Sequence, residues 1–193
     1  MFMVDKMRIL VLVSGEKNKG NTKRIVNAFL CGLKKGNHDI KCINLCEVQI
    51  NPCKDCNACV YLKDKFCVQE DGLNEILDEI MQSDCIVFAS PIYFSFFSGT
   101  MKLLIDRFHA IGKKYNYDYP KKKFIVLATA AGDGSSFNLL KAFINEIFIE
   151  HMKWEELAFY GVSNCKFNDD FISKENDLMA IEEIGEKLRR KDE

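Results

Sequence analysis

Short apolar runs alternate with segments of helical periodicity along most of the chain, and this alternation constrains the fold more than any other feature of the sequence. The runs are almost continuously apolar, which is typical of strands buried on both faces of a parallel sheet. We expect strands at Met7–Val13, Ile40–Leu45, Cys85–Ala89, Phe124–Ala130 and Leu157–Val162.

Five helices are expected between and after these strands, because apolar residues recur there at helical spacing. One runs from Asn21 to a stop at Gly36, a second covers Gly99–Phe108, and the others carry Leu73, Ile76, Leu77 and Ile80, then Phe143, Ile144, Ile147 and Phe148, then Leu178, Ile181 and Leu188. This order predicts an α/β fold: a doubly wound, five-stranded parallel sheet with helices on both faces. Ligands of such sheets bind at the carboxyl ends of the strands, where the strand order reverses.

Length and charge favour one globular domain over residues 1–193. The chain is 48% hydrophobic, and its 27 lysines and arginines nearly balance 28 acidic residues, which argues against nucleic-acid binding. No apolar stretch approaches the ~20 residues of a membrane-spanning helix, and the N-terminus lacks the pattern of a signal peptide. We therefore expect a cytoplasmic protein with no membrane partner, in which the nine cysteines are kept reduced.

The first strand runs into a loop, Ser14–Thr22, that has the spacing of a triphosphate-binding loop except that Asn21 replaces the lysine. Without that cation the loop suits a monophosphate, because its donors are neutral side chains and the N–H groups at the start of a helix. Ser14, Asn21 and Thr22 supply the side chains, and Gly20 lets the backbone approach closely. A surface turn before an N-capped helix has a similar composition, so this loop alone leaves both interpretations open.

The loops after the third and fourth strands suit a flat aromatic ligand. The first carries aromatic residues where the core should give way to solvent, so they could form a platform for a ring, although phenylalanine is more often a core residue. The second is built of small residues, so a ligand edge could meet bare backbone there. The candidates are Pro91, Ile92, Tyr93, Phe94, Ala130, Ala131 and Gly132.

Together these loops resemble the flavodoxin-like NAD(P)H-dependent FMN reductase family. The resemblance covers about the first 135 residues and consists of the loop ending in GNT, the stretch SPIYF, and the motif G-x-x-K-x-x-x-D-R, formed by Gly99, Lys102, Asp106 and Arg107. It implies a flavodoxin-like fold that binds FMN. The phosphate would lie on Ser14–Thr22, the isoalloxazine ring on Pro91–Phe94, and the ring edge and ribityl chain near Ala130–Gly132.

The first loop departs from the family pattern, which usually reads GSPRKNGNT. It is one residue longer, and Gly15 and Glu16 stand where proline and arginine are common. The choice between Lys17 and Lys19 as a phosphate contact is therefore open, and Lys17 is included among the candidates.

Four cysteines are concentrated in a polar loop expected at about residues 46–70. They are Cys53, Cys56, Cys59 and Cys67, with the spacing C-x2-C-x2-C-x7-C. Thiolates at three-residue intervals can hold one face of a [4Fe–4S] cluster, and a fourth cysteine can close it. Redox-responsive thiols without metal and a structural zinc site are the alternatives. Within the family, the motif resembles that of the iron–sulfur flavoproteins, which implies a [4Fe–4S] cluster.

The resemblance implies an oxidoreductase that passes electrons from NAD(P)H or a reduced carrier, through FMN, to a small-molecule acceptor or an electron-carrier protein. No protein acid or base is required, and His38, His109 and His151 lie outside the ligand loops. The alternatives are a plain FMN or quinone reductase without metal and a non-enzymatic flavin electron carrier. Family members are often dimers or tetramers, so we expect a homodimer or homotetramer.

Overall fold

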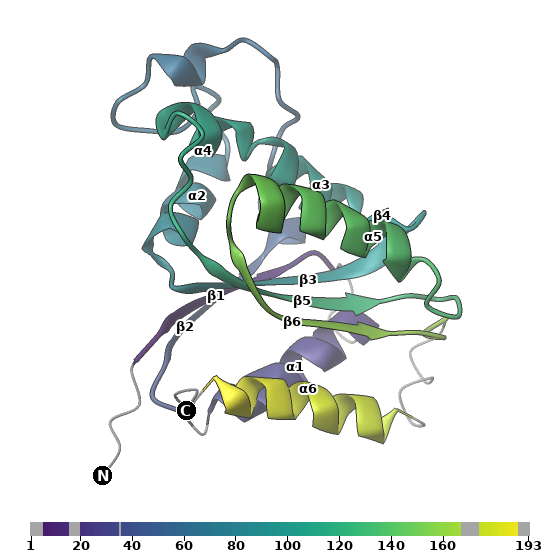
Figure 1. Ribbon diagram of the computed structural model, residues 1–193. Helices are drawn as coiled ribbons and strands as arrows, with labels where there is room; N and C mark the ends of the chain where they lie inside the picture. The colour runs from purple at the N-terminus through teal and green to yellow at the C-terminus, as the bar shows by residue number, and fades with distance from the viewer. Residues whose placement is uncertain (1–5, 16–19, 35, 167–173, 189–193) are drawn as a thin grey trace.

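The structure is organised around a parallel sheet with helices on both of its faces (Figure 1). This computed structural model describes residues 6–15, 20–34, 36–166 and 174–188. The strand order is β2–β1–β3–β5–β6, with parallel pairing throughout, and it reverses between β1 and β3. The strands are β1 (Arg8–Val13), β2 (Asp39–Asn44), β3 (Cys85–Tyr93), β5 (Lys123–Thr129) and β6 (Glu155–Val162). The predicted doubly wound α/β sheet is therefore confirmed.

Two layers of helices enclose the sheet. Helices α1 and α6 cover one face, and α2, α3 and α5 cover the other, with α4 following α3 (Figure 1). Their bounds are α1 (Asn21–Leu33), α2 (Leu73–Gln82), α3 (Gly99–Asp106), α4 (His109–Lys114), α5 (Phe137–Ile144) and α6 (Glu175–Lys187). Three short turns are η1 (Leu45–Glu47), η2 (Ala58–Val60) and the π-helical η3 (Asn145–His151). Among the described residues, no helix has the length and apolar character needed to cross a membrane.

The central strands send alternate side chains into two separate cores. In β1, Leu10 and Leu12 belong to the core beneath α2, α3 and α5. Ile9, Val11 and Val13 belong to the core beneath α1 and α6. A strand alternates its side chains with a period of two, so burial on both faces requires almost every residue to be apolar. This explains why continuous apolar runs in the sequence predicted the strands.

Three local features differ from the expected elements. The helix predicted over Gly99–Phe108 ends earlier, and Arg107 is its C-cap, before α4 begins. The helix predicted around Phe143–Phe148 changes from α-helical to π-helical geometry after Ile144. A two-residue strand, β4 (Phe96–Phe97), pairs antiparallel with the end of β3 and is too short to give a periodic sequence signal.

Helices α1 and α6 cross where glycines face the backbone of the opposite helix. A Cβ atom added at Gly32 would lie 2.1 Å from the carbonyl oxygen of Glu182, and one added at Gly185 would lie 2.5 Å from the carbonyl oxygen of Phe29. Backbone atoms cannot rotate away as a flexible side chain can. The two glycines therefore permit the close packing that holds α6 on this face of the sheet.

We predict that Gly32→Ala destabilises the protein by about 1–3 kcal/mol, because the new methyl group forces the two helices apart. The free energy of unfolding, measured by urea denaturation, checks this. Gly99→Ala is the matched control, since Gly99 is also helical and no heavy atom lies within 4 Å of a Cβ added there. Equal stability of Gly32→Ala and the unmodified protein would contradict the prediction.

Candidate functional site

Three loops meet at the carboxyl edge of the sheet, where the strand order reverses. The Ser14 amide donates to the Ala89 carbonyl at 2.9 Å, which extends the contact of β1 and β3 beyond the last rung. The Ser98 hydroxyl donates to the Ser14 hydroxyl at 2.8 Å. The hydroxyls of Thr22 and Thr129 lie 3.2 Å apart. The end of β1 and the start of α1 thus contact the start of α3 and the end of β5 at this edge.

The start of α1 can receive an anion. Its N-cap is Gly20, with φ −74° and ψ 166°, no side chain caps the helix, and the first turn carries no acidic residue. The first turn itself therefore adds no negative charge to the positive end of the helix dipole. Thr22 is buried in the first turn. The side-chain amide of Asn21 donates through Nδ2 to the Cys165 carbonyl at 3.1 Å, which connects α1 to the segment after β6. Lys17 lies outside the described residues.

Buried serines connect the phosphate-loop candidates to the aromatic candidates. The Ser98 hydroxyl also accepts from the Met101 amide and so caps α3, while the Ser98 amide donates to the Ser90 hydroxyl at 3.0 Å. Ser90 in turn donates to the Pro91 carbonyl at 2.7 Å. Sequence reasoning missed Ser90 and Ser98 as site residues. The signal for Ser98 is its place directly before a helix, where serine is a preferred cap.

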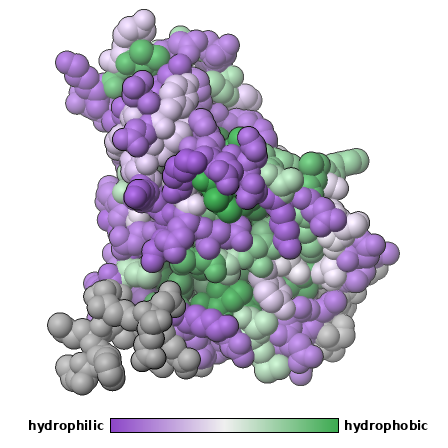
Figure 2. Space-filling model, in the orientation of Figure 1, coloured by the Kyte–Doolittle hydropathy of each residue, from purple (hydrophilic) through white to green (hydrophobic). Residues whose placement is uncertain are grey.

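The aromatic candidates divide between the core and the surface. Ile92 is buried and pairs with Phe97, and Tyr93 pairs with Phe96 in a hairpin. The turn residues Phe94 and Ser95 have φ values of 49° and 62°, as in the tight type I′ turn that matches strand twist. Phe94 is fully exposed and Tyr93 is 61% exposed. Figure 2 shows an apolar protrusion at this end of the molecule.

The third loop is held by the end of β6. The Ala130 amide donates to the Val162 carbonyl, and the Ala130 carbonyl accepts from the Cys165 amide, both at 2.9 Å. The Gly132 carbonyl accepts from the Asn164 amide at 2.7 Å. Ala130 is buried, whereas Ala131 and Gly132 are exposed at the rim, where a ligand edge could meet them.

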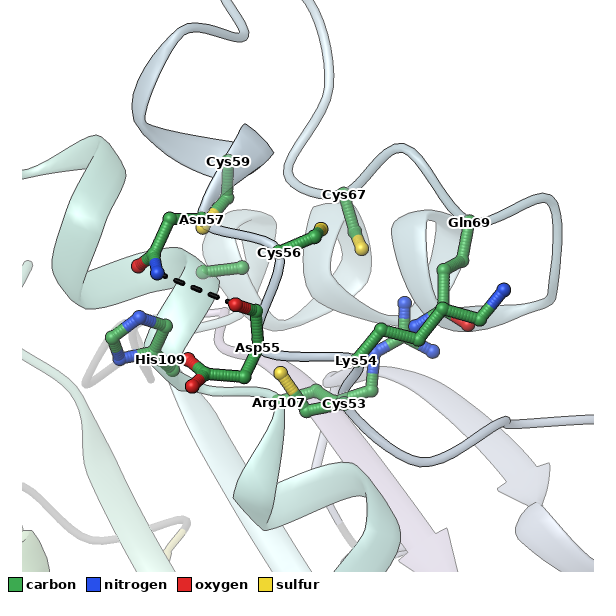
Figure 3. Close-up of a pocket in the computed structure, with 11 residues that line it drawn as sticks. Cys53, Lys54, Asp55, Cys56, Asn57, Cys59, Cys67, Gln69, Arg107 and His109 are labelled. Atoms are coloured by element: carbon green, nitrogen blue, oxygen red, sulfur yellow. Dashed lines mark hydrogen bonds between the residues drawn. The ribbon is translucent and has the colours of Figure 1, made fainter.

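The four cysteines of the C-x2-C-x2-C-x7-C motif lie around one hollow, away from the three loops. We call it the cysteine hollow (Figure 3). It lies over the start of α4, at the end of α3 opposite to Ser98. The loop follows β2, which ends at the same edge of the sheet as β1 and β3, but it folds back over the helix layer (Figure 1). The lining residues are Cys53, Lys54, Asp55, Cys56, Asn57, Cys59, Cys67, Gln69, Arg107, His109 and Ala110.

The four thiols influence one another, but they are not arranged as metal ligands. Burial raises the pKa of the Cys59 thiol, and the charges of the other three thiols raise it further. Within the described residues none of the four forms a disulfide, and no group of three or more His, Cys, Asp or Glu side chains is placed to hold a metal ion. Binding a metal here would require the thiols to move closer together.

Arg107 fastens both ends of the cysteine loop to α3. Its Nη1 donates to the Asn51 carbonyl at 3.1 Å and to the Asp71 carboxylate, and Asp71 also accepts from the Asn51 amide at 2.9 Å. Burial alone would raise the pKa of Asp71, but hydrogen bonds from Asn51, Arg107 and Leu73 outweigh it and hold that pKa below its usual value. The ion pair between Arg107 and Asp71 is buried, so it fixes the loop to the end of α3 in one arrangement, which an exposed ion pair would not do.

The strand order and the loops at its reversal define a flavodoxin-like α/β protein. Residues 7–154 match the model of the NADPH-dependent FMN reductase family, and the chain belongs to this family. The family resemblance seen in the sequence is confirmed.

Individual relatives agree with this assignment. The chain is 32% identical over 121 residues to an iron–sulfur flavoprotein of Archaeoglobus fulgidus, an alignment that covers 63% of this chain and 58% of that protein. It is 24% identical over 178 residues to iron–sulfur flavoprotein MJ0731 of Methanocaldococcus jannaschii, covering 92% of this chain and 88% of that protein. The NAD(P)H:quinone oxidoreductase from Methanothermobacter marburgensis has a similar fold, with a TM-score of 0.77, 16% identity, and coverage of 97% and 100%.

We predict that Phe94→Asn raises the free energy of unfolding by about 1 kcal/mol, because asparagine tolerates a left-handed backbone and an exposed ring loses no burial. Urea denaturation of the protein without flavin measures this. Tyr93→Asn, at the adjacent paired position, is the control and should lower stability. A Phe94→Asn variant less stable than the unmodified protein would show that the ring supports the fold.

Proposed function

We propose that this protein is an FMN-dependent oxidoreductase that takes electrons from NAD(P)H or a reduced carrier and passes them to a small-molecule acceptor or an electron-carrier protein. The convergence of three loops at the reversal of strand order, through the contacts of Ser14 and Thr22, carries the proposal. Family membership supports the same reading. We further propose that residues 1–193 form one FMN-binding domain that works in the cytoplasm as a homodimer or homotetramer.

The phosphate would be held at the start of α1. The backbone from Gly20 onward, the Thr22 hydroxyl and the Ser14 hydroxyl are neutral donors, and the helix dipole adds partial positive charge. We propose Asn21 and Lys17 as further contacts in the same loop. When bound, FMN itself supplies the redox chemistry, since it can exchange electrons in pairs or singly, and the protein supplies binding and orientation.

The ring would lie on the end of β3 and the turn that follows it, between their exposed and buried side chains. Tyr93 and Phe94 are exposed aromatic surfaces at the rim, and Pro91 and Ile92 form the backbone beneath them. The small residues Ala130, Ala131 and Gly132 would border the ring edge and ribityl chain. The hydrogen bonds of Ser90 and Ser98 fix this platform relative to the phosphate loop, so both parts of the flavin site form together.

We also propose that the four cysteines bind a [4Fe–4S] cluster. Four thiols around one hollow are a suitable donor set. Arg107 also lines the hollow, its Nη2 has no hydrogen-bond partner among the described residues, and its positive charge suits an anionic group. Because ligand thiols must lose their protons and come together, cluster binding would be coupled to closure of the loop. The names of the iron–sulfur flavoprotein relatives support this choice over zinc or metal-free thiols.

The proposed sites lie at opposite ends of α3. Ser98 caps its start beside the flavin loops, and Arg107 caps its end beneath the cysteine hollow. Eight residues of α-helix span about 12 Å, so the flavin and the cluster of one chain would not be in contact. Electrons would pass along this helix or between the subunits of an oligomer.

We predict that the purified protein binds FMN and catalyses repeated oxidation of NADH or NADPH when an artificial electron acceptor is present. Absorbance of the reduced nicotinamide follows the reaction. Protein that stays colourless and ignores added FMN would overturn the proposal. Protein that binds FMN but turns over neither nucleotide would instead be an electron carrier.

Thr22→Val tests the proposed phosphate site in the same experiment. A hydrogen bond to a charged group contributes roughly 1.5–3 kcal/mol, so FMN affinity should fall about tenfold or more, whereas riboflavin, which lacks the phosphate, should be little affected. Ser83→Ala removes a hydroxyl that is equally buried but donates to the Glu79 carbonyl at the opposite edge of the sheet, and it should leave FMN affinity unchanged.

We predict that protein made without oxygen contains about four iron and four acid-labile sulfide per chain. Cys59→Ser should lose most of both, because it removes a ligand, whereas Cys42→Ser, at an exposed cysteine of β2, should retain them. Zinc without sulfide would indicate a structural zinc site. Absence of all three would indicate metal-free thiols and a plain reductase.

A further inference from the structure

Arg107 uses only part of its guanidinium group to fasten the cysteine loop. Nη1 makes both contacts described above, to Asn51 and Asp71, whereas Nη2 is buried and has no hydrogen-bond partner among the described residues. The Arg107 side chain is 2% exposed and therefore has little contact with bulk water. A buried donor left without a partner has lost its hydrogen bonds to water without a replacement, and the loss is larger when the group is charged.

The unpartnered nitrogen belongs to a side chain that lines the cysteine hollow. Figure 3 shows the guanidinium beneath the loop that carries Cys53, Cys56 and Cys67. Gln69 lines the same hollow, donates through Nε2 to the Pro52 carbonyl at 3.1 Å, and leaves its buried Oε1 without a partner among the described residues. Two side chains that line this hollow are therefore more than nine-tenths buried, and each has a polar atom without a hydrogen-bond partner among the described residues.

We infer that Arg107 is a positioning residue for the proposed cluster: Nη1 closes the loop, and Nη2 donates a hydrogen bond to a cluster sulfide or to a cysteine thiolate that binds the iron. This inference rests on the proposed function. The acceptors would be negatively charged sulfur atoms of the cluster or of its cysteine ligands. The G-x-x-K-x-x-x-D-R motif thereby gains a second role, since its arginine serves both the end of α3 and the cysteine hollow.

The consequence is a change in the reduction potential of the cluster. Reduction adds negative charge, so a cationic donor stabilises the reduced form more than the oxidised form and raises the potential. Hydrogen bonds to the sulfurs are among the factors that set such potentials. A residue that only closed the loop would affect stability and iron content, but it would not affect the potential of a cluster that still assembles.

The test is a redox titration of the anaerobically prepared protein, followed by electron paramagnetic resonance of the reduced cluster. Two variants remove the donor in different ways. Arg107→Lys keeps a positive charge but loses the second nitrogen. The double variant Arg107→Met/Asp71→Leu removes both members of the buried pair, which leaves the net charge unchanged and is often tolerated by the fold. Arg8→Lys, at an exposed arginine paired with Glu79, is the matched control.

We expect the double variant to shift the equilibrium between oxidised and reduced cluster about tenfold toward the oxidised form, which for one electron is about 59 mV. Arg107→Lys should shift it in the same direction, and Arg8→Lys should not. Variants with the potential of the unmodified protein would overturn the donor role while leaving the cluster proposal intact. Loss of the cluster from both Arg107 variants, with FMN binding retained, would show that Arg107 only closes the loop. An unmodified protein without iron and sulfide would overturn the cluster proposal itself.

Discussion

Burial of β1 and β3 on both faces is the constraint on which the rest of the structure depends. These neighbouring strands lie at the reversal of strand order and are covered by helices above and below, so they contain almost no polar side chains. Polar chemistry is therefore displaced to the ends of the strands, where Ser14 and Ser90 mark the transition from core to loop. The same reversal leaves room between the loops that diverge from these strands, which is why ligands bind there in this architecture.

Helix α3 connects the two parts of the molecule that can carry redox groups. At its start, Ser98 both caps the helix and joins the hydroxyl network of the flavin loops. At its end, Arg107 caps the helix and fastens the cysteine loop through Asn51 and Asp71. A rigid helix fastened at both ends by buried polar contacts fixes the relative position of the two sites. The cysteines themselves lie on the loop that Arg107 fastens.

Local sequence signals predicted much of this arrangement. Continuous apolar runs identified the strands because double-sided burial permits few other residues. The binding of a phosphate by Gly20, Asn21 and Thr22 stays a prediction. The aromatic stretch at the end of β3 was predicted less well. Ile92 is buried and Phe94 is exposed, because the register of the hairpin decides which side chains face the core. Ser98, Thr129 and the dual role of Arg107 were missed because their partners are distant in the sequence.

The sequence by itself determined the sheet, its helices and the family, because each of these depends on periodicity or on motifs of nearby residues. Only the tertiary structure decided where the cysteines lie. The loop leaves the sheet at the carboxyl end of β2, and contacts between residues distant in the sequence, among them the buried ion pair of Arg107 and Asp71, hold it at the far end of α3. Contacts between residues so far apart leave no periodic pattern in the sequence, so only the packing of the folded chain decides where the cysteine loop lies.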